Sequence, residues 1–273
     1  MMRTPVCWVA SALLAVLPAH AAVNSGPHGG EVDQSAALSL SQSAIGAMVG
    51  SHRFVDRRGR TLELDELRGK PLVVSLIYTS CAHTCPMLTS HLANTVKIAR
   101  EALGDDSFRV LTLGFDTPVD TPVRMASFAR ERAIDLPGWY FASADAATID
   151  AFSRELGFVF FPSAAGFDHL AQTTVLDADG RVYTQVYGQS FDPPSLVEPL
   201  KQLVFGTHAD ARSLSGWVSG VRLFCTVYDP ASGRYRFDYS IFIALGVGLL
   251  CLGAVAVFIV RAWRERSAPT SAV

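Results

Sequence analysis

The chain has 273 residues, 49% of them hydrophobic, and a formal net charge of −2 at neutral pH. This near-neutral charge, without a long basic stretch, gives no indication of nucleic-acid binding. Five cysteines are too few for a disulfide-stabilised scaffold of this length, so we expect one ordinary domain together with membrane segments.

The N-terminal residues have the features of a secretory signal peptide. Arg3 supplies the positive start, residues 6–17 form an apolar run, and Ala19-His20-Ala21 resembles a cleavage site. The apolar run is too short to span a bilayer. We therefore expect residues 1–21 to be a signal peptide that directs the chain out of the cytoplasm.

Residues 22–50 are rich in Ala, Ser and Gly and show no sustained period, so we expect a linker with at most a frayed helix. From residue 51 to residue 205, short apolar runs alternate with amphipathic stretches. Because the run at 72–78 is continuously apolar, we expect it at the centre of an α/β sheet that helices cover. The predicted elements are two strands around the Gly59 turn, strands at 72–78, 108–115 and 139–142, helices at 86–104, 121–133 and 145–156, hairpin strands at 173–176 and 182–186, and a helix at 194–205.

A second hydrophobic segment, residues 239–260, is long enough to span a bilayer and contains no charged side chain. Three arginines in residues 261–273 follow it, which indicates a cytoplasmic tail. With a cleaved signal peptide, this arrangement puts the soluble domain in the periplasm or otherwise outside the cytoplasm. Residues 206–238 form an extension, of undetermined structure, between the domain and this transmembrane helix.

The end of the strand at 72–78 carries the residues on which the chemistry depends. Cys81 and Cys85 follow it, and Pro86 opens the next helix. The free N–H groups and partial positive charge of a helix N-terminus favour thiolates. Such a pair either binds a soft metal or does redox chemistry. A structural disulfide is the third interpretation, but a disulfide that closes so short a loop removes little entropy from the unfolded chain and therefore stabilises the fold little. A cysteine pair between a strand and a helix of an α/β unit indicates a thioredoxin-like fold.

A metal on these two thiols would need at least one further ligand, and Cu(I) and Zn(II) are the candidates. His169, which we expect in the loop before the hairpin, is the leading third ligand. Two sulfurs and one nitrogen suit Cu(I) better than structural zinc, which takes four ligands. We expect His83 to face solvent and His91 to be an exposed helix residue. Asp116 and Asp120 are expected to cap a turn and a helix, or else to form an acidic edge of the metal site.

The stretches TSCAHTCP, DTPVDTP and DHLAQTTVLDADG, in this order and spacing, resemble those of the Sco/SenC family of copper-binding proteins. The resemblance covers residues 50–205. It implies a thioredoxin fold, anchoring to a membrane outside the cytoplasm, and a role in assembling the copper site of cytochrome c oxidase. By this resemblance, Cys81 and Cys85 match the copper-ligating thiols, and His169 matches the histidine ligand.

Three features depart from the family pattern. The familiar anchor is N-terminal, whereas we expect a C-terminal anchor here. His83 differs from the residues that usually lie between the two cysteines of the family motif. Asp116 and Asp120, in contrast, match the family's acidic positions. The sequence LFCTVYDPASGRY at 223–235 lies outside the usual domain, and we interpret its Cys225 as buried and inert, with pairing between two chains as the alternative.

The sequence therefore predicts a membrane-anchored copper chaperone that delivers copper to the copper-site subunit of a respiratory oxidase, cytochrome c oxidase. Reduced Cys81 and Cys85, together with His169, would hold the copper, so binding would depend on redox state. The alternative is a thiol–disulfide oxidoreductase that uses the same two cysteines to reduce those of the oxidase copper site. A thiol peroxidase is less well supported, because the sequence identifies no arginine to stabilise its nucleophile.

Overall fold

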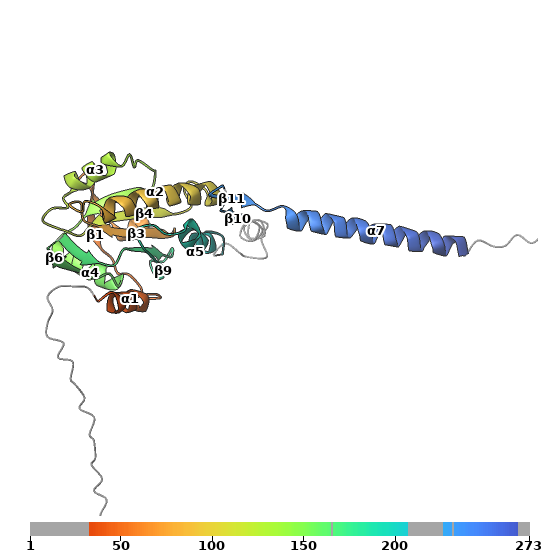
Figure 1. Cartoon of the computed structure of the whole chain (residues 1–273), viewed down its shortest axis with the longest axis horizontal. Helices are drawn as coiled ribbons and strands as arrows, with labels where there is room; N and C mark the ends of the chain where they lie inside the picture. The colour runs from red at the N-terminus through yellow and green to blue at the C-terminus, as the bar shows by residue number, and fades with distance from the viewer. Residues whose placement is uncertain (1–32, 165, 207–225, 231, 267–273) are drawn as a thin grey trace, which may run out of the picture.

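The structure, a computed structural model, describes residues 33–164, 166–206, 226–230 and 232–266. These residues form a seven-stranded mixed sheet with helices on both faces, two separate hairpins and one long C-terminal helix (Figure 1). The expected signal peptide and Cys225 lie outside the described residues.

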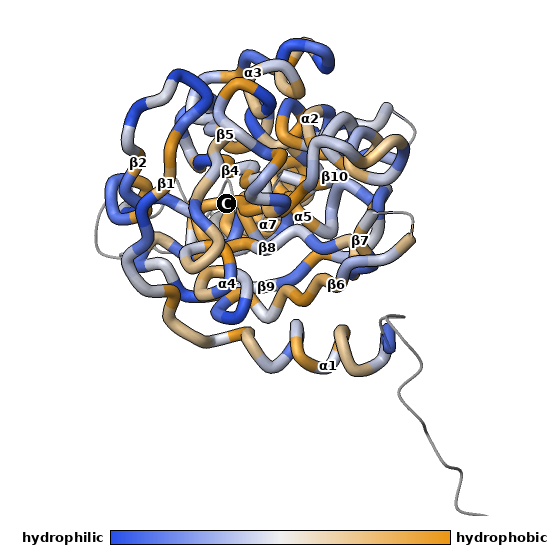
Figure 2. The backbone as a smooth tube through the Cα atoms, turned by 90° about the vertical axis from the view of Figure 1, so that its left-hand side faces the viewer, coloured by the Kyte–Doolittle hydropathy of each residue, from blue (hydrophilic) through white to orange (hydrophobic). Residues whose placement is uncertain are grey.

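Three parallel strands occupy the middle of the sheet, whose strand order is β2-β1-β5-β4-β3-β8-β9. They are β3 (Leu72–Ile77), β4 (Arg109–Gly114) and β5 (Trp139–Ser143). Every residue of β3 is buried, as expected for a strand that helices cover on both faces. Figure 2 shows hydrophobic colour around β4 in the middle of the domain, where the apolar helix α7 lies behind it in the same view. The predicted central position of the apolar strand is confirmed.

Antiparallel strands complete both edges of the sheet. On one side, β1 (Arg53–Asp56) pairs with both β5 and β2 (Thr61–Glu63), and Gly59 turns between β1 and β2 with a φ of +79°. On the other side, β8 (Gln172–Leu176) pairs with both β3 and β9 (Val182–Tyr187). Both hairpins agree with the sequence prediction.

The helices form a layer on each face of the sheet. Right-handed crossovers from β3 to β4 and from β4 to β5 place α2 (Thr84–Leu103) and α3 (Pro122–Glu131) on the same face. Figure 1 shows α4 (Ala146–Glu155) on the opposite face. The last helix of the domain, α5 (Pro193–Gly206), packs against α2. This is the predicted α/β sheet with flanking helices.

The second half of the expected linker belongs to the folded unit. Asp33 caps α1 (Gln34–Ser43) by accepting backbone N–H groups of its first turn. Ser41 of α1 is buried, and its hydroxyl oxygen lies 2.9 Å from the Tyr187 hydroxyl oxygen on β9. The interpretation of residues 22–50 as a tether is therefore wrong for the part that forms α1, because this helix is capped and has a packed face.

A separate hairpin lies within the C-terminal extension. It consists of β10 (Thr226–Asp229) and β11 (Arg234–Phe237), and β11 packs against α2. The buried Lys201 of α5 donates a 2.6 Å hydrogen bond to the Thr226 carbonyl oxygen. The extension therefore docks on the domain through α2 and α5.

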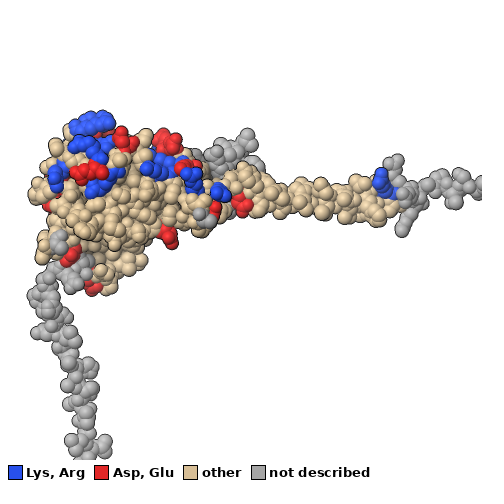
Figure 3. All heavy atoms as spheres, turned by 45° about the horizontal axis from the view of Figure 1, so that its top comes forward, with Lys and Arg blue, Asp and Glu red and all other residues tan. Residues whose placement is uncertain are grey.

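The long helix α7 (Ser240–Arg266) begins three residues after this hairpin. Its segment Ser240–Trp263 has 24 residues, is strongly apolar, and has none of its length buried against the rest of the protein. Figure 3 shows basic side chains only at its far end. By length and composition, α7 can cross a membrane.

We predict that Lys201→Met loosens the docked hairpin in the full-length chain. The substitution retains the apolar stem but removes the buried ammonium group that binds the Thr226 carbonyl. Hydrogen bonds to charged groups contribute about 1.5–3 kcal/mol, so amide hydrogen exchange of residues 226–237 should accelerate about tenfold or more. Lys97→Met, at an exposed position of α2, is the control. Equal exchange in Lys201→Met and wild type would contradict the prediction.

Candidate metal centre

The cysteine pair lies where β3 passes into α2. Cys81 is half-buried in the connecting turn, and Cys85 is buried in the first turn of α2. The Cys85 backbone N–H donates to the Cys81 sulfur over 3.4 Å, so the helix N-terminus interacts with this thiol as expected. Pro86 occupies the same first turn, where a missing N–H costs little. Both cysteines are free thiols.

The two thiols differ in their electrostatic surroundings. Burial raises the pKa of Cys81, but backbone N–H groups of Cys85 and His83 and the Tyr78 hydroxyl outweigh it, so the net pKa is lowered. Burial raises the pKa of the Cys85 thiol, and the nearby charges of Cys81 and Asp120 raise it further. Cys81 is therefore the thiol that ionises first and meets solvent.

His169 lies on a small hairpin beside the main sheet. It is the last residue of β7 (Gly166–His169), which pairs with β6 (Phe160–Ser163). The expected loop position of His169 is therefore wrong. Phe160 and Phe161, the last two residues of the apolar sequence FVFF, begin the strand on which the histidine-bearing segment folds back.

The His169 ring is enclosed by aromatic side chains. Its centroid lies 6.0 Å from that of Tyr78 and 5.5 Å from those of Phe115 and Phe158. This burial lowers the pKa of His169, so the neutral imidazole is favoured. Its Nδ1 lies 3.0 Å from the Leu170 carbonyl oxygen, which can only accept a hydrogen bond. This contact puts the proton on Nδ1 and leaves the lone pair on Nε2, the form that binds a metal.

The structure brings the two cysteines together but does not assemble a complete ligand set. Within the described ranges, no group of three His, Cys, Asp or Glu side chains could hold a metal ion. Tyr78 lies between the two parts, since its ring packs edge-on against His169 and it precedes Cys81 by three residues. No sequence motif indicated this position of Tyr78, although the residue ends the apolar run directly before the cysteine motif.

Asp120 holds the turn that carries the cysteines. Its Oδ1 accepts the Thr79 backbone N–H over 2.8 Å and the Thr79 hydroxyl over 2.6 Å, while its Oδ2 accepts the Asp116 N–H over 2.9 Å. The expected helix-capping role belongs instead to Thr121, whose hydroxyl accepts the Arg124 N–H of α3. Asp120 therefore positions Thr79, two residues before Cys81.

The other two histidines differ in their surroundings. His83 is exposed, as expected, at the residue before α2. His91 is half-buried: its Nε2 lies 2.6 Å from the Phe191 carbonyl oxygen, and its ring packs edge-on against the Phe191 ring. The prediction of an exposed helix residue is therefore wrong for His91, which ties α2 to the segment before α5.

An arginine that the sequence did not identify lies near the buried thiol. Arg132, just after α3, is largely buried, with its guanidinium 3.4 Å from the centroid of the Phe128 ring. It is close enough to interact electrostatically with Cys85. This positive charge thus lies near Cys85, the less accessible of the two thiols.

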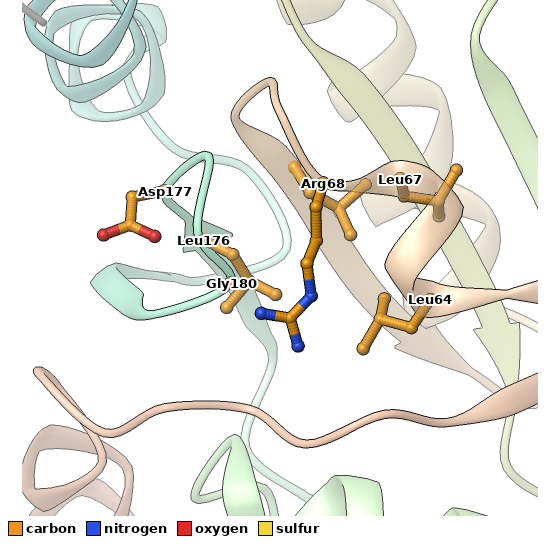
Figure 4. A pocket seen from close by; sticks show the side chains of 7 residues that line it. Leu64, Leu67, Arg68, Leu176, Asp177 and Gly180 are labelled. Atoms are coloured by element: carbon orange, nitrogen blue, oxygen red, sulfur yellow. The ribbon is translucent and has the colours of Figure 1, made fainter.

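Two hollows of the described surface lie apart from the thiols. One, of about 570 Å³, is lined by Arg57, Arg58, Arg130 and their neighbours. Figure 3 shows a group of basic side chains on the end of the domain far from α7. The other is a small crevice between η1 (Leu64–Leu67) and the β8–β9 turn, crossed by Arg68 (Figure 4). Arg68 donates to the carbonyl oxygens of Val49 and Asp179, so this crevice is structural.

The comparison with family models identifies the chain. The model described as SCO1/SenC matches residues 41–204, more than half of the sequence. The chain belongs to the SCO1/SenC family. The SCO1 protein homolog of Bacillus subtilis (strain 168) is 25% identical over 88 residues, which are 32% of this chain and 45% of that relative. The match thus spans less than half of the relative's length.

Solved structures agree with this membership. A protein of Aquifex aeolicus VF5 is 28% identical with a TM-score of 0.52, over 57% of this chain and 92% of the other. A SCO1/SenC family lipoprotein of Bacillus anthracis str. Ames is 20% identical with a TM-score of 0.53, over 58% and 95%. BsSco, a member of the Sco family of cytochrome c oxidase assembly proteins, is 20% identical with a TM-score of 0.52, over 58% and 94%. These similarities confirm the predicted thioredoxin-like fold.

We predict that Asp120→Ala destabilises the domain. The substitution leaves the donors of Thr79 and Asp116 without their acceptor in a buried place, which costs about 1–3 kcal/mol in the free energy of unfolding. Chemical denaturation monitored by circular dichroism measures this change. Asp116→Ala is the matched control, because the described residues give its carboxylate no hydrogen-bond partner. Equal losses of unfolding free energy in the two variants would show that the hydrogen bonds accepted by Asp120 contribute nothing to stability.

We also predict that the two thiols react at different rates. Cys81 is partly exposed and its pKa is lowered, whereas Cys85 is buried and its pKa is raised. Under reducing conditions at neutral pH, iodoacetamide should alkylate Cys81 at least about tenfold faster than Cys85, since the thiolate is the nucleophile. Peptide mass spectrometry over a time course assigns the two rates. Faster labelling of Cys85 would reverse the assignment.

Proposed function

We propose that this SCO1/SenC protein is a membrane-anchored copper chaperone that acts outside the cytoplasm and delivers copper to the copper-site subunit of cytochrome c oxidase. Cys81, Cys85 and His169 are its copper ligands. The observation that carries the proposal is the pair of reduced thiols at the start of α2, with a neutral, metal-competent imidazole on the adjacent hairpin. The family role of BsSco in oxidase assembly supports it.

The chemistry of the donor set favours Cu(I) as the cargo. Two thiolates and one imidazole provide soft, low-coordinate ligation, whereas structural zinc takes four ligands. Because Cys81 is half-exposed, a recipient can approach it and exchange ligands one at a time. His169 Nε2 would be the third ligand beside the two sulfurs, and binding would require both thiols to be reduced.

The proposed membrane arrangement rests on sequence features at both ends of the chain. We propose that residues 1–21 are a cleaved signal peptide and that the apolar helix α7, which arginines follow, crosses the membrane, so that the domain would lie outside and the C-terminus in the cytoplasm. The docked β10–β11 hairpin contacts the C-terminal half of α2, where Arg234 lies 3.8 Å from Glu101. Cys85 lies 16 residues away along α2, about 24 Å at 1.5 Å per residue. The thiols therefore face away from the bilayer, toward a recipient site held above the membrane.

A second candidate function, thiol–disulfide oxidoreductase, is favoured by the inequality of the two thiols. The Cys81 thiolate would attack one sulfur of a recipient disulfide, forming a mixed disulfide and releasing one recipient thiolate. Cys85, after losing its proton, would attack the Cys81 sulfur and release the second recipient thiolate, so that two electrons pass and a Cys81–Cys85 disulfide remains. BsSco is described as having a disulfide switch.

The test is copper binding by the reduced full-length chain in detergent, in wild type and in His169→Ala. We expect one copper per chain, with two sulfurs and one nitrogen by X-ray absorption. In His169→Ala, the Cu(I) affinity should fall about 100-fold or more, which corresponds to about 2.7 kcal/mol. His83→Ala is the control, because this exposed histidine lies beside the same cysteines.

Disulfide exchange with a model disulfide, measured on the same samples, separates the two functions. The oxidoreductase does not use an imidazole ligand, so His169→Ala should retain its exchange rate while it loses copper. Absence of stable copper in wild type, or equal affinity in wild type and His169→Ala, would overturn the chaperone proposal.

A further inference from the structure

The hollow beside the C-terminal end of α3 is rich in arginine. Its volume is about 570 Å³, which is within the range of about 300–1,000 Å³ that is typical of ligand-binding sites. It is open to solvent, and residues of the β1–β2 turn, of α3 and of the segment after α3 line it. The lining includes three arginines, one carboxylate and two small side chains: Arg57, Arg58, Arg130, Asp135, Ala126 and Ala133.

The single carboxylate of the lining already has a cationic partner. Asp135 Oδ1 accepts a hydrogen bond from Arg57 Nη2 over 2.7 Å. Arg57 Nη1 donates to the Ile134 carbonyl oxygen over 3.3 Å, and the guanidinium lies 6.0 Å from the centroid of the Phe141 ring. Because Arg57 offsets the charge of Asp135, the other two arginines give the hollow a net positive charge.

These two arginines have donors available for a ligand. Arg58 and Arg130 are exposed, and neither forms an ion pair with another described residue. Arg130 donates from Nη2 to the Ser127 hydroxyl oxygen over 2.9 Å, which leaves most of its five N–H donors unused. The planar fork of an arginine matches a carboxylate with two parallel hydrogen bonds. The hollow is therefore suited to an anion with more than one acidic group.

The C-terminal end of α3 does not oppose an anion in this place. The last carbonyl groups of a helix carry partial negative charge, but two of them are satisfied here. The Ala129 and Arg130 carbonyl oxygens accept the N–H groups of Ile134 and Ala133, over 3.0 Å in both cases. Ala133 has a φ of +51°, alone among the described residues other than glycine, as this closing turn requires. The guanidinium groups therefore dominate the charge of the hollow.

The hollow lies away from the docked C-terminal extension. β1 lies next to β2, which forms one edge of the sheet, whereas α5 contacts β8 and β9 at the opposite edge. Figure 1 likewise shows α3 and β1 on the side of the domain that is far from α7. A site beside β1 is thus clear of the helix proposed to cross the membrane, which favours a protein partner over an anionic lipid surface.

We propose that this arginine-lined hollow binds an acidic segment of a partner protein that presents two or more neighbouring carboxylates. Arg58 from the β1–β2 turn and Arg130 from α3 each bind one carboxylate. The small side chains of Ala126 and Ala133 leave room for the backbone of the segment. Because the hollow is open to solvent, the segment can continue beyond it at both ends. This site is independent of the copper site proposed above.

The test is a titration of fluorescein-labelled hexaglutamate with the metal-free full-length chain in detergent, followed by fluorescence anisotropy. We expect saturable binding that weakens as the salt concentration rises, because the contacts join exposed charges. Arg58→Gln and Arg130→Gln should each lower the affinity about threefold, and the double variant about tenfold. Ala126→Leu should also lower the affinity, because it fills the hollow without changing the charge.

Arg124→Gln is the matched control for the loss of charge. It removes one positive charge from the same helix, at an exposed residue outside the hollow, so it should bind hexaglutamate like the wild type. Equal weakening in Arg124→Gln and Arg130→Gln would show that the peptide responds only to net charge, and this would overturn the proposal. Wild-type affinity in both the double variant and Ala126→Leu would overturn it as well.

Inorganic tripolyphosphate, used as a second probe, separates a protein partner from a small anion. If tripolyphosphate binds and hexaglutamate does not, the hollow is a small-anion site and the proposed acidic segment is wrong. If neither probe binds, the hollow is not an anion site. Since no copper is present in these titrations, their outcome does not depend on whether the protein is a copper chaperone.

Discussion

The structure depends on the junction where the buried strand β3 meets the N-terminus of α2. The strand is fixed by parallel pairing with β4 and antiparallel pairing with β8, so its end cannot shift without breaking the sheet. Asp120 then holds Thr79 through its backbone and its hydroxyl. Because both anchors are buried, the turn that follows presents Cys81 at a defined place over the free N–H groups of the helix.

The same junction makes the two thiols chemically unequal. The helix N–H groups stabilise a thiolate at Cys81, whereas burial, the charge of Cys81 and the charge of Asp120 disfavour one at Cys85. A half-exposed thiolate beside a buried thiol can receive a metal ion or attack a disulfide. The geometry of the pair therefore serves both candidate functions, and the imidazole on the neighbouring hairpin is what favours copper.

The docked C-terminal extension connects the domain to the apolar helix α7. Lys201 and β11 attach the hairpin to α5 and α2, and α7 begins three residues beyond it. Since α2 runs from the thiols toward this hairpin, the thiols and the extension lie at opposite ends of one helix.

The sequence by itself determined the fold class, the cysteine pair and the apolar C-terminal helix, because each follows from local patterns: continuous apolar runs, helical spacing and a strand-to-helix turn. Tertiary structure decided the rest. The packing of α1, the burial of His91 and the hairpin that carries His169 depend on partners far along the chain. Tyr78 is the clearest case, because its ring packs against Phe167 and His169, about 90 residues away, which no local spacing brings beside it.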